Sequence, residues 1–294
     1  HTFFEMLGNW SFGDYYKNDA IMWAWEYLTE ELKLDKKRLW VTIYKDDDES
    51  GKLWKKLTDI DHSRVLKFGD KDNFWEMGET GPCGPCTEIH YYVGDDIDSQ
   101  DPTGVNSDEL YREIWNLVFI QYNREKNGKL VELPVKHVDT GMGLERLLST
   151  INGLKDHYET DLFKPIILEL ERLSSVKCIG DKGIPHRVVA DHLRMLSFSI
   201  ADGAMPSNDG RGYVVRRVLR RASRYGKLLG LDDPFIFKLV KILSEIMGEA
   251  YPEIIDKKSH IEQVIKSEET SFLKTVDKGI TKFEEIASKL SKGG

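Results

Sequence analysis

The chain has 294 residues, of which 40% are hydrophobic, 31% charged and 11% aromatic. This composition is typical of a folded globular protein and excludes both a disordered segment and a disulfide-stabilised miniprotein. At roughly 150 residues per domain, the length predicts two domains. The 42 Lys and Arg against 50 Asp and Glu give a net charge of −8, so any nucleic-acid site must be local.

Apolar runs, cysteine content and the N-terminal sequence give the expected cellular location of the chain. The apolar runs, such as Leu117–Ile120, are far shorter than the ~20 residues that span a bilayer, so we expect no membrane association. Three cysteines are too few for a disulfide framework and predict a cytoplasmic protein. The sequence opens at His1 without an initiator Met or a signal peptide, and we expect that it is truncated there.

The first half of the chain predicts a sheet with helices. Apolar periodicity favours a helix over Asn18–Leu34, and the dipeptide Asn127-Gly128 between two β-rich runs predicts a two-residue hairpin turn. A hairpin implies antiparallel pairing, so the expected class is α+β. The predicted strands are Leu39–Tyr44, Thr87–Tyr92, Ile114–Tyr122 and Val135–Val138.

The second half is predicted to be helical, because apolar residues recur there every three or four positions. We expect a joint within 152–161, with domains at 1–152 and 153–294, and a mostly solvated amphipathic helix or helix pair over 259–292. The predicted helices are Phe163–Leu173, Val188–Ile200, Gly212–Leu229, Pro234–Met247 and Ser259–Leu290.

The stretch VDTGMGLERL at 138–147 combines a β-prone run, two glycines and the start of a helical pattern. A strand, a glycine turn and a helix N-terminus together form an anion site, because free backbone N–H groups point outward. Arg146 would add a positive group suited to phosphate or to stacking on a base. The alternative is an ordinary glycine turn before a helix.

The run IWNLVFIQY at 114–122 predicts a buried central strand. Alternation places Ile114, Asn116, Val118 and Ile120 on one face. An amide on such a face must find partners or cost about 1–3 kcal/mol. Asn116 is therefore either a structural hydrogen-bonding group or a ligand contact in a small pocket floored by Val118.

Cys83, Cys86 and His90 have a spacing that could bind zinc. A closed site needs four ligands, and no fourth is evident, since His62 and His137 are remote. The alternative is a rigid Gly-Pro loop with buried thiols.

A basic stripe follows residue 208. Between Arg211 and Lys227 there are seven cations and no acid. On a helix, five of these cations share one broad arc: Arg216, Arg217, Arg220, Arg221 and Arg224. The opposite side is apolar and is formed by Val215, Val218, Leu219 and Ala222. Such a stripe favours a phosphate backbone as its partner. Solvation, or pairing with acidic helices, is the alternative.

Together these stretches resemble the alanyl-tRNA synthetase family over nearly the whole chain. The run HTFFEMLGNWSFGDYYK at 1–17 resembles the second half of motif 2, and VDTGMGLERL resembles motif 3 of class II synthetases. DNFWEMGETGPCGPCTEIH at 72–90 and EIWNLVFIQYNRE at 113–125 resemble the active-site strands. NDGRGYVVRRVLRRASRYG at 208–226 is similar to the start of the tRNA-recognising helical region.

The resemblance implies a class II antiparallel sheet flanked by helices, followed by an all-helical domain that recognises the tRNA acceptor stem. It also implies a ligase that activates L-alanine with ATP and transfers it to tRNA(Ala). Asp139, Asn116 and Arg146 would be catalytic; Asp139 would bind the alanine ammonium, and one of Phe3 and Phe4, preferably Phe4, would stack on adenine. The implied contacts are, for ATP, His1, Phe4, Trp75, Ile114, Trp115, Asn116, Gly143 and Arg146; for alanine, Asn116, Val118, Asp139 and Gly141; and for tRNA, Asn208, Arg216, Arg217 and Arg220.

The resemblance also implies Mg²⁺, bound with ATP, and no zinc in this part of the family's architecture. Motif 1 and the first strand of motif 2 have no counterpart before His1, so the chain is expected to be a poor enzyme as it stands, or a tRNA-binding module without activity. The editing and oligomerising regions of the family would lie beyond Gly294. We therefore expect no oligomer and no correction of misactivated Gly or Ser.

Overall fold

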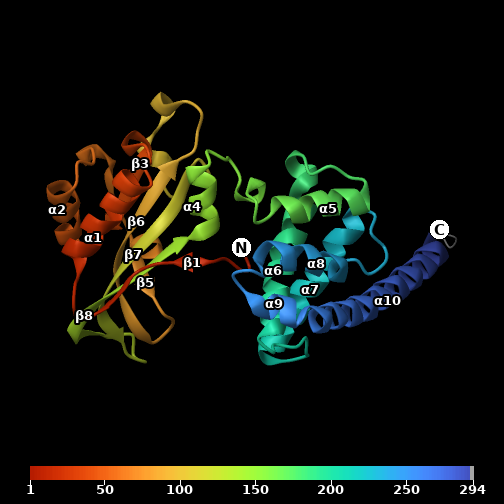
Figure 1. The fold of residues 1–294 in the computed structure, drawn as a ribbon. Coiled ribbons are helices and arrows are strands. Elements are labelled where there is room, and N and C mark those ends of the chain that lie inside the picture. The colour runs from red at the N-terminus through yellow and green to blue at the C-terminus, as the bar shows by residue number, and fades with distance from the viewer. Residues whose placement is uncertain (292–294) are drawn as a thin grey trace. The chain divides into compact units, whose positions relative to one another are not determined.

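The protein is described here from a computed structural model that covers residues 1–291 (Figure 1). Two compact units divide the chain. The sheet unit contains residues 4–157, and the helical unit contains the chain from Tyr158 onward together with His1–Phe3. The domain division at residue 152 stays a prediction. No described helix has the length and apolarity needed to cross a bilayer.

The sheet unit is built on eight strands in the order β1-β8-β7-β6-β3-β4, with β2 beside β8 and β5 beside β6. All pairs are antiparallel except β3 with β4. With its helices, this confirms the α+β class and the class II-like sheet. The strands are β1 (Met6–Leu7), β2 (Trp10–Phe12), β3 (Leu39–Tyr44), β4 (Val65–Phe68), β5 (Phe74–Glu76), β6 (Gly81–Tyr92), β7 (Tyr111–Arg124) and β8 (Leu130–Gly143).

One face of the sheet is covered by α1 (Lys17–Glu26) and α2 (Asp48–Leu57), which Figure 1 shows to the left of the strands. The other helices of this unit are α3 (Asp70–Asn73) and α4 (Leu144–Ile151), and a π-helical turn at Tyr27–Glu31 continues α1. Ile21 of α1 and Trp54 of α2 are fully buried against strand residues such as Leu117 and Phe119. The Trp54 indole donates to Thr87 Oγ1 at 2.9 Å, which satisfies its polar atom in the core.

The predicted hairpin joins β7 to β8, but its turn is longer than expected. The Glu125 N–H donates to Lys129 O at 2.9 Å, and the Gly128 N–H donates to Glu125 O at 2.8 Å. Gly128 has φ +82. The connection therefore has three residues, with glycine in the left-handed position that a three-residue loop requires.

A second departure from prediction lies in β7. The register pairs Ile89 with Trp115 but His90 with Glu113, so Ile114 is an extra residue in a β-bulge. Ile114 consequently packs in the helix-covered core with Trp115 and Leu117. The expectation that simple alternation holds through Ile114 is wrong, because the bulge shifts the side-chain phase by one residue.

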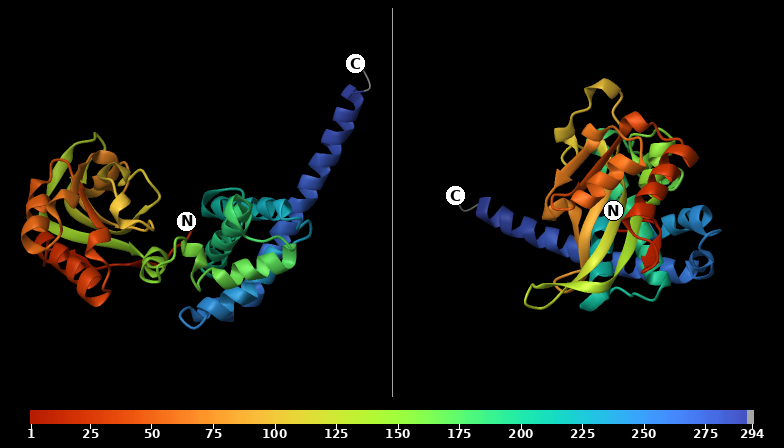
Figure 2. Two further views of the ribbon diagram at one scale, coloured as in Figure 1. Left: turned by 90° about the horizontal axis from the view of Figure 1, so that it is seen from above. Right: turned by 90° about the vertical axis from the view of Figure 1, so that its left-hand side faces the viewer.

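The helical unit contains all five predicted helices, with ends shifted by at most four residues. They are α5 (Lys164–Ser174), α6 (Ile184–Ala201), α7 (Gly210–Leu228), α8 (Ile236–Met247) and α10 (Lys258–Ser291), with a short α9 (Pro252–Asp256) between the last two. Their core includes Leu193, Leu219 and Leu239, all fully buried. The charged segment predicted as a helix or a pair is one helix, which Figure 2 shows extending beyond the other helices of its unit; Lys292 lies outside the described residues.

A buried carboxylate joins α10 to the start of α8. Glu269 Oε2 accepts hydrogen bonds from the backbone N–H groups of Phe235 at 3.1 Å and Ile236 at 3.2 Å. These N–H groups have no partner within the helix, so the carboxylate caps α8. Burial raises the pKa of Glu269 from 4.5 to about 7.

The raised pKa predicts a pH-dependent stability of the helical unit. Between about pH 4.5 and 7 the folded state holds a proton that the unfolded state has lost, so the unfolding free energy falls as pH rises, by about 3 kcal/mol in total. The variant Glu269→Gln, which cannot ionise, removes this component. Urea unfolding followed by far-ultraviolet circular dichroism at about pH 5 and about pH 8 measures it, and parallel pH profiles for the two proteins would contradict the prediction.

Gly84 allows β6 to lie close to β7. A Cβ atom on Gly84 would lie 2.0 Å from the carbonyl oxygen of Phe119, well inside contact distance, and backbone cannot move aside as a side chain can. We therefore predict that Gly84→Ala destabilises the sheet unit by about 1–3 kcal/mol or more. All seven Trp lie in this unit, so their fluorescence during urea unfolding reports it alone. The control Gly78→Ala, with nothing within 4 Å, should change stability by less than about 0.5 kcal/mol; equal effects would contradict the account.

Candidate active site

Polar side chains gather on the face of the sheet that α1 and α2 do not cover. The register pairs residues of β3 with β6, β6 with β7 and β7 with β8 into continuous rows, and side chains that oppose one another across antiparallel strands share a face. We call two neighbouring rows the polar face: Thr42, Glu88, Asn116 and Gly141 in the first, and Cys86, Val118 and Asp139 in the second.

Asn116 and Asp139 are diagonal neighbours on the polar face. Asn116 opposes Gly141 and Asp139 opposes Val118, two residues along each strand. Diagonal neighbours lie ~7 Å apart, close enough for both side chains to contact one small ligand. Both side chains are half-buried, and the side chain of Val118 between them is buried. The structure thus brings together two of the three residues predicted to be catalytic.

Arg146 reaches the same face through an ion pair. Its NH1 donates to the carboxylate Oε2 and to the backbone O of Glu113, both at 3.0 Å. Glu113 opposes His90, which shares a face with Glu88, so Glu113 lies beside the polar face. The Arg146 side chain remains 44% exposed, so it is accessible to a ligand.

The expected glycine turn before α4 is absent. β8 continues through Gly143, and α4 begins at Leu144, so Gly141 and Gly143 are strand residues. The Leu144 N–H, which would face an anion, donates instead to the backbone O of Glu5 at 2.9 Å. The first N–H of the helix therefore holds the segment before β1. Gly141 lies opposite Asn116, and a Cβ there would lie 3.2 Å from Met6 Sδ, so a larger residue would require the Met6 side chain to move.

Three aromatic or aliphatic residues predicted to line the ATP site lie in different surroundings. Ile114 and Trp115 are 1% and 7% exposed and belong to the helix-covered core. Trp75 lies on β5 opposite Gly84 and is half-buried. Roles for these side chains in nucleotide binding stay predictions.

The first four residues divide between the two units. The His1 ring lies 3.2 Å from Asp191 Oδ1, and the Phe3 ring stacks on Phe198 with centroids 4.5 Å apart, both within the helical unit. Phe4 belongs to the sheet unit and is 43% exposed. Of the two phenylalanines, Phe3 is thus committed to packing, whereas the Phe4 ring is accessible.

Cys83, Cys86 and His90 do not converge. They lie on β6, so the expected Gly-Pro loop is a strand, although both thiols are buried as anticipated. Cys86 and His90 are ~13 Å apart along a strand that rises ~3.3 Å per residue, too far to share one ion. No group of three metal-ligating side chains occurs among the residues that the structure describes. The zinc-site hypothesis for these residues is wrong.

The arginine stripe on α7 is split by α10. Arg216 Nε and Arg220 NH2 lie 3.2 and 2.9 Å from Glu268 Oε1, and Arg216 also donates to Asn208 Oδ1. Pairing with an acidic helix, the alternative weighed against nucleic acid, therefore accounts for part of the stripe. Arg217, Arg221 and Arg224, spaced four and three residues apart, are exposed, and within residues 1–291 the structure shows no ion pair for them.

Sequence reasoning missed the polar groups that surround Asn116. Glu88, 8% exposed, lies within hydrogen-bonding distance of Asn116, Thr42 and His90. Polar residues occur at every second position of this strand, at Cys86, Glu88 and His90. This alternation is the sequence pattern that could have indicated a polar face. Burial and the neighbouring Glu88 raise the pKa of the Cys86 thiol above its usual value.

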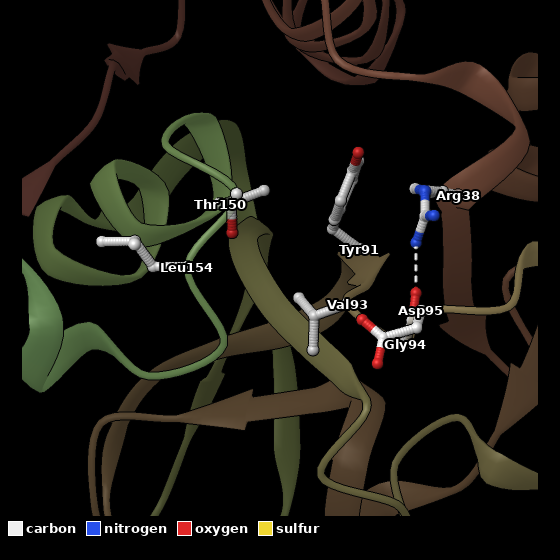
Figure 3. A pocket seen from close by; sticks show the side chains of 8 residues that line it. Arg38, Tyr91, Val93, Gly94, Asp95, Thr150 and Leu154 are labelled. Atoms are coloured by element: carbon white, nitrogen blue, oxygen red, sulfur yellow. Dashed lines mark hydrogen bonds between the residues drawn. The ribbon is translucent and has the colours of Figure 1, made fainter.

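Two cavities in the sheet unit lie apart from these residues. One, of about 310 Å³, lies between the end of β6 and the end of α4; Figure 3 shows the Arg38 side chain at its wall donating to Gly94 O, at 2.7 Å. The other, of about 440 Å³, has several acids in its lining, among them Asp46, Asp48 and Glu132. No residue predicted to bind ATP or alanine lines either one.

Comparison with known proteins identifies the family. The model of the family described as "tRNA synthetases class II (A)" matches residues 1–294. The chain belongs to this family. It is 52% identical over 298 residues to the alanine–tRNA ligase of Chlorobaculum tepidum, covering 100% of the chain and 34% of that protein.

Other relatives agree. The alanine–tRNA ligase of Chlorobium chlorochromatii is 52% identical over 99% of the chain and 33% of the relative, and that of Legionella pneumophila strain Paris is 50% identical over 95% and 32%. The chain thus spans about a third of the length of the curated relatives it matches.

Proposed function

We propose that this class II synthetase chain is the alanine-activating and acceptor-stem-binding part of an alanine–tRNA ligase. The observation that carries the proposal is the convergence of Asn116 and Asp139 on one face of the sheet, beside the ion pair of Arg146. Family membership and the names of the relatives support the substrate. ATP would enter as its Mg²⁺ complex, and the protein would act in the cytoplasm.

The proposed reaction has two steps. A carboxylate oxygen of alanine attacks the α-phosphorus of ATP, the bond to the β-phosphate breaks, and pyrophosphate leaves. A terminal ribose hydroxyl of tRNA(Ala) then attacks the alanyl carbonyl carbon; AMP leaves and the hydroxyl proton passes to solvent or AMP. Such chemistry depends mainly on positioning and charge stabilisation, which Asp139, Asn116 and Arg146 can supply without a covalent intermediate.

The proposed assignments follow from position. Asp139 and Asn116 would bind the ammonium end of alanine, Val118 would contact its methyl group, and Gly141 would leave the space for it. Arg146 would contact phosphate or adenine opposite Phe4, and Gly143 would allow close approach of the nucleotide. His1, Trp75, Ile114 and Trp115 are weaker candidates for the ATP site, because His1 packs with the helical unit and the others are wholly or partly buried.

The Asp139→Asn variant tests the ammonium contact. Loss of one charged hydrogen-bond partner costs about 1.5–3 kcal/mol, so kcat/KM for alanine in alanine-dependent pyrophosphate exchange should fall about 10- to 100-fold. Exposed Asp14 is a matched control, and Asp14→Asn should leave the exchange rate unchanged. Equal rates for Asp139→Asn and wild type would contradict the assignment.

The exposed arginines of α7 are the proposed phosphate contacts. Arg217, Arg221 and Arg224 form one stripe, whereas Arg216 and Arg220 are engaged by Glu268. Of the four tRNA contacts implied by the resemblance, Arg217 remains exposed and unpaired within the described chain, and Asn208 contacts Arg216.

We therefore predict that Arg217→Ala, Arg221→Ala and Arg224→Ala each weaken tRNA binding and lower the slope of log affinity against log salt by about one. Filter binding across a salt series measures both quantities. Arg216→Ala should instead chiefly lower the melting temperature, since it breaks a contact between α7 and α10. Weaker tRNA binding in Arg216→Ala, with unchanged binding in the other three variants, would instead assign the tRNA surface to the arginines that pair with Glu268.

A tRNA-binding module of the same family without activity is the second candidate, favoured by the exposed arginine stripe. Calorimetric titration with a non-hydrolysable alanyl-adenylate analogue separates the two. Binding to the wild-type chain supports the ligase, whereas salt-dependent tRNA binding without analogue binding selects the module.

A further inference from the structure

The buried carboxylate of Glu88 lies at the centre of a hydrogen-bond chain that the proposed reaction does not yet use. Glu88 Oε1 is 3.4 Å from Asn116 Nδ2, and Oε2 is 3.3 Å from Thr42 Oγ1 and 3.2 Å from His90 Nε2. Burying such a group is costly unless it is satisfied. Its contacts therefore constrain how its neighbours are oriented.

A backbone carbonyl beside Asn73 fixes which atoms donate and which accept in this series of hydrogen bonds. The Asn73 amide donates from Nδ2 to Cys86 O at 3.2 Å and to Thr42 Oγ1 at 2.8 Å. A carbonyl oxygen only accepts, so the NH2 group of Asn73 must be the end that faces it. Thr42 Oγ1 then accepts from Asn73, and its one proton is directed to Glu88 Oε2.

Glu88 in turn fixes the amide of Asn116. Asn116 presents its NH2 group to Glu88, because Nδ2 is the amide atom within hydrogen-bonding distance of Glu88 Oε1 and a carboxylate oxygen accepts. The carbonyl Oδ1 of Asn116 therefore points away from Glu88. It is buried and has no hydrogen-bond partner within residues 1–291, an arrangement that costs about 1–3 kcal/mol unless a ligand supplies a donor.

We propose that Glu88 is a positioning residue that makes the site selective for a cationic ammonium group. With the amide held this way, Asn116 contributes an acceptor oxygen beside the carboxylate of Asp139, its diagonal neighbour. Two acceptors suit an ammonium, which has three donors and no acceptor. The opposite amide orientation would place an NH2 group there and repel the ammonium. This inference rests on the proposed function, because it assigns the alanine ammonium to that position.

The test uses two ligands that differ only at the ammonium group. One is a non-hydrolysable alanyl-adenylate analogue, and the other is its desamino counterpart, which lacks the nitrogen. Calorimetry gives the preference of the 294-residue chain for the first over the second. Glu88→Gln keeps the volume of the side chain but no longer dictates the orientation of Asn116, so this preference should fall about tenfold while affinity for the desamino ligand changes less than about twofold.

A double-mutant cycle separates positioning from general structural support. Asn116→Ala should lower the preference by a similar factor, and adding Glu88→Gln to it should lower the preference no further. Glu76→Gln, at a partly exposed carboxylate paired with Arg124, is the matched control and should keep the wild-type preference.

Three results would overturn the inference. The first is an unchanged preference in Glu88→Gln, the second is an equal loss of affinity for both ligands in that variant, and the third is additive losses in the double variant. Failure of the wild-type chain to bind either ligand would reject the proposed function together with this inference, so the two failures are distinguishable.

Discussion

Continuous pairing of β6, β7 and β8 determines which side chains can act together. Glu88, Asn116 and Gly141 are 28 and 25 residues apart along the chain, yet the register aligns them in one row. A shift of one residue in any pair would turn these groups to the opposite face. The bulge at Ile114 is therefore important, because it sets the phase in which Glu113 and Asn116 both lie on the side of His90 and Glu88.

The two faces of the sheet meet different energetic requirements. The covered face buries large side chains such as Trp54, Leu117 and Phe119, which stabilise the unit through the removal of apolar surface from water. The polar face buries groups that are costly unless they are hydrogen-bonded. The Asn73 Nδ2 group donates to Thr42 Oγ1, which lies within hydrogen-bonding distance of Glu88 Oε2. Asn73 Oδ1 and Asn116 Oδ1 are buried without a protein partner in the described structure. Of these atoms, Asn116 Oδ1 is the one to which the proposed substrate would supply a donor.

Local sequence predicted most of the elements. The run LWVTIY is strand β3 with the predicted ends, and the helical periodicity located α5 to α8 and α10 to within a few residues. Asn127-Gly128 correctly indicated the hairpin, and alternation along β7 placed Asn116 and Val118 on one face. These features depend on residues near one another in sequence, or on alternation along a strand.

The features that sequence reasoning missed depend on distant partners. The bulge at Ile114 arises from pairing with Ile89 and His90, and the division of the arginine stripe depends on Glu268, 48 residues beyond Arg220. Nothing near His1 indicates that it packs beside Asp191. Similarly, the absence of a glycine turn at Gly141–Gly143 follows from the pairing of β8 with β1, not from the glycines themselves.

The most direct test of this account is a crystal structure of the chain with the non-hydrolysable alanyl-adenylate analogue bound. The account predicts the ammonium nitrogen at about 3 Å from both an Asp139 carboxylate oxygen and Asn116 Oδ1, with Glu88 still accepting from Asn116 Nδ2. An analogue bound away from the polar face, or an Asn116 amide that turns its NH2 group toward the ligand, would contradict it.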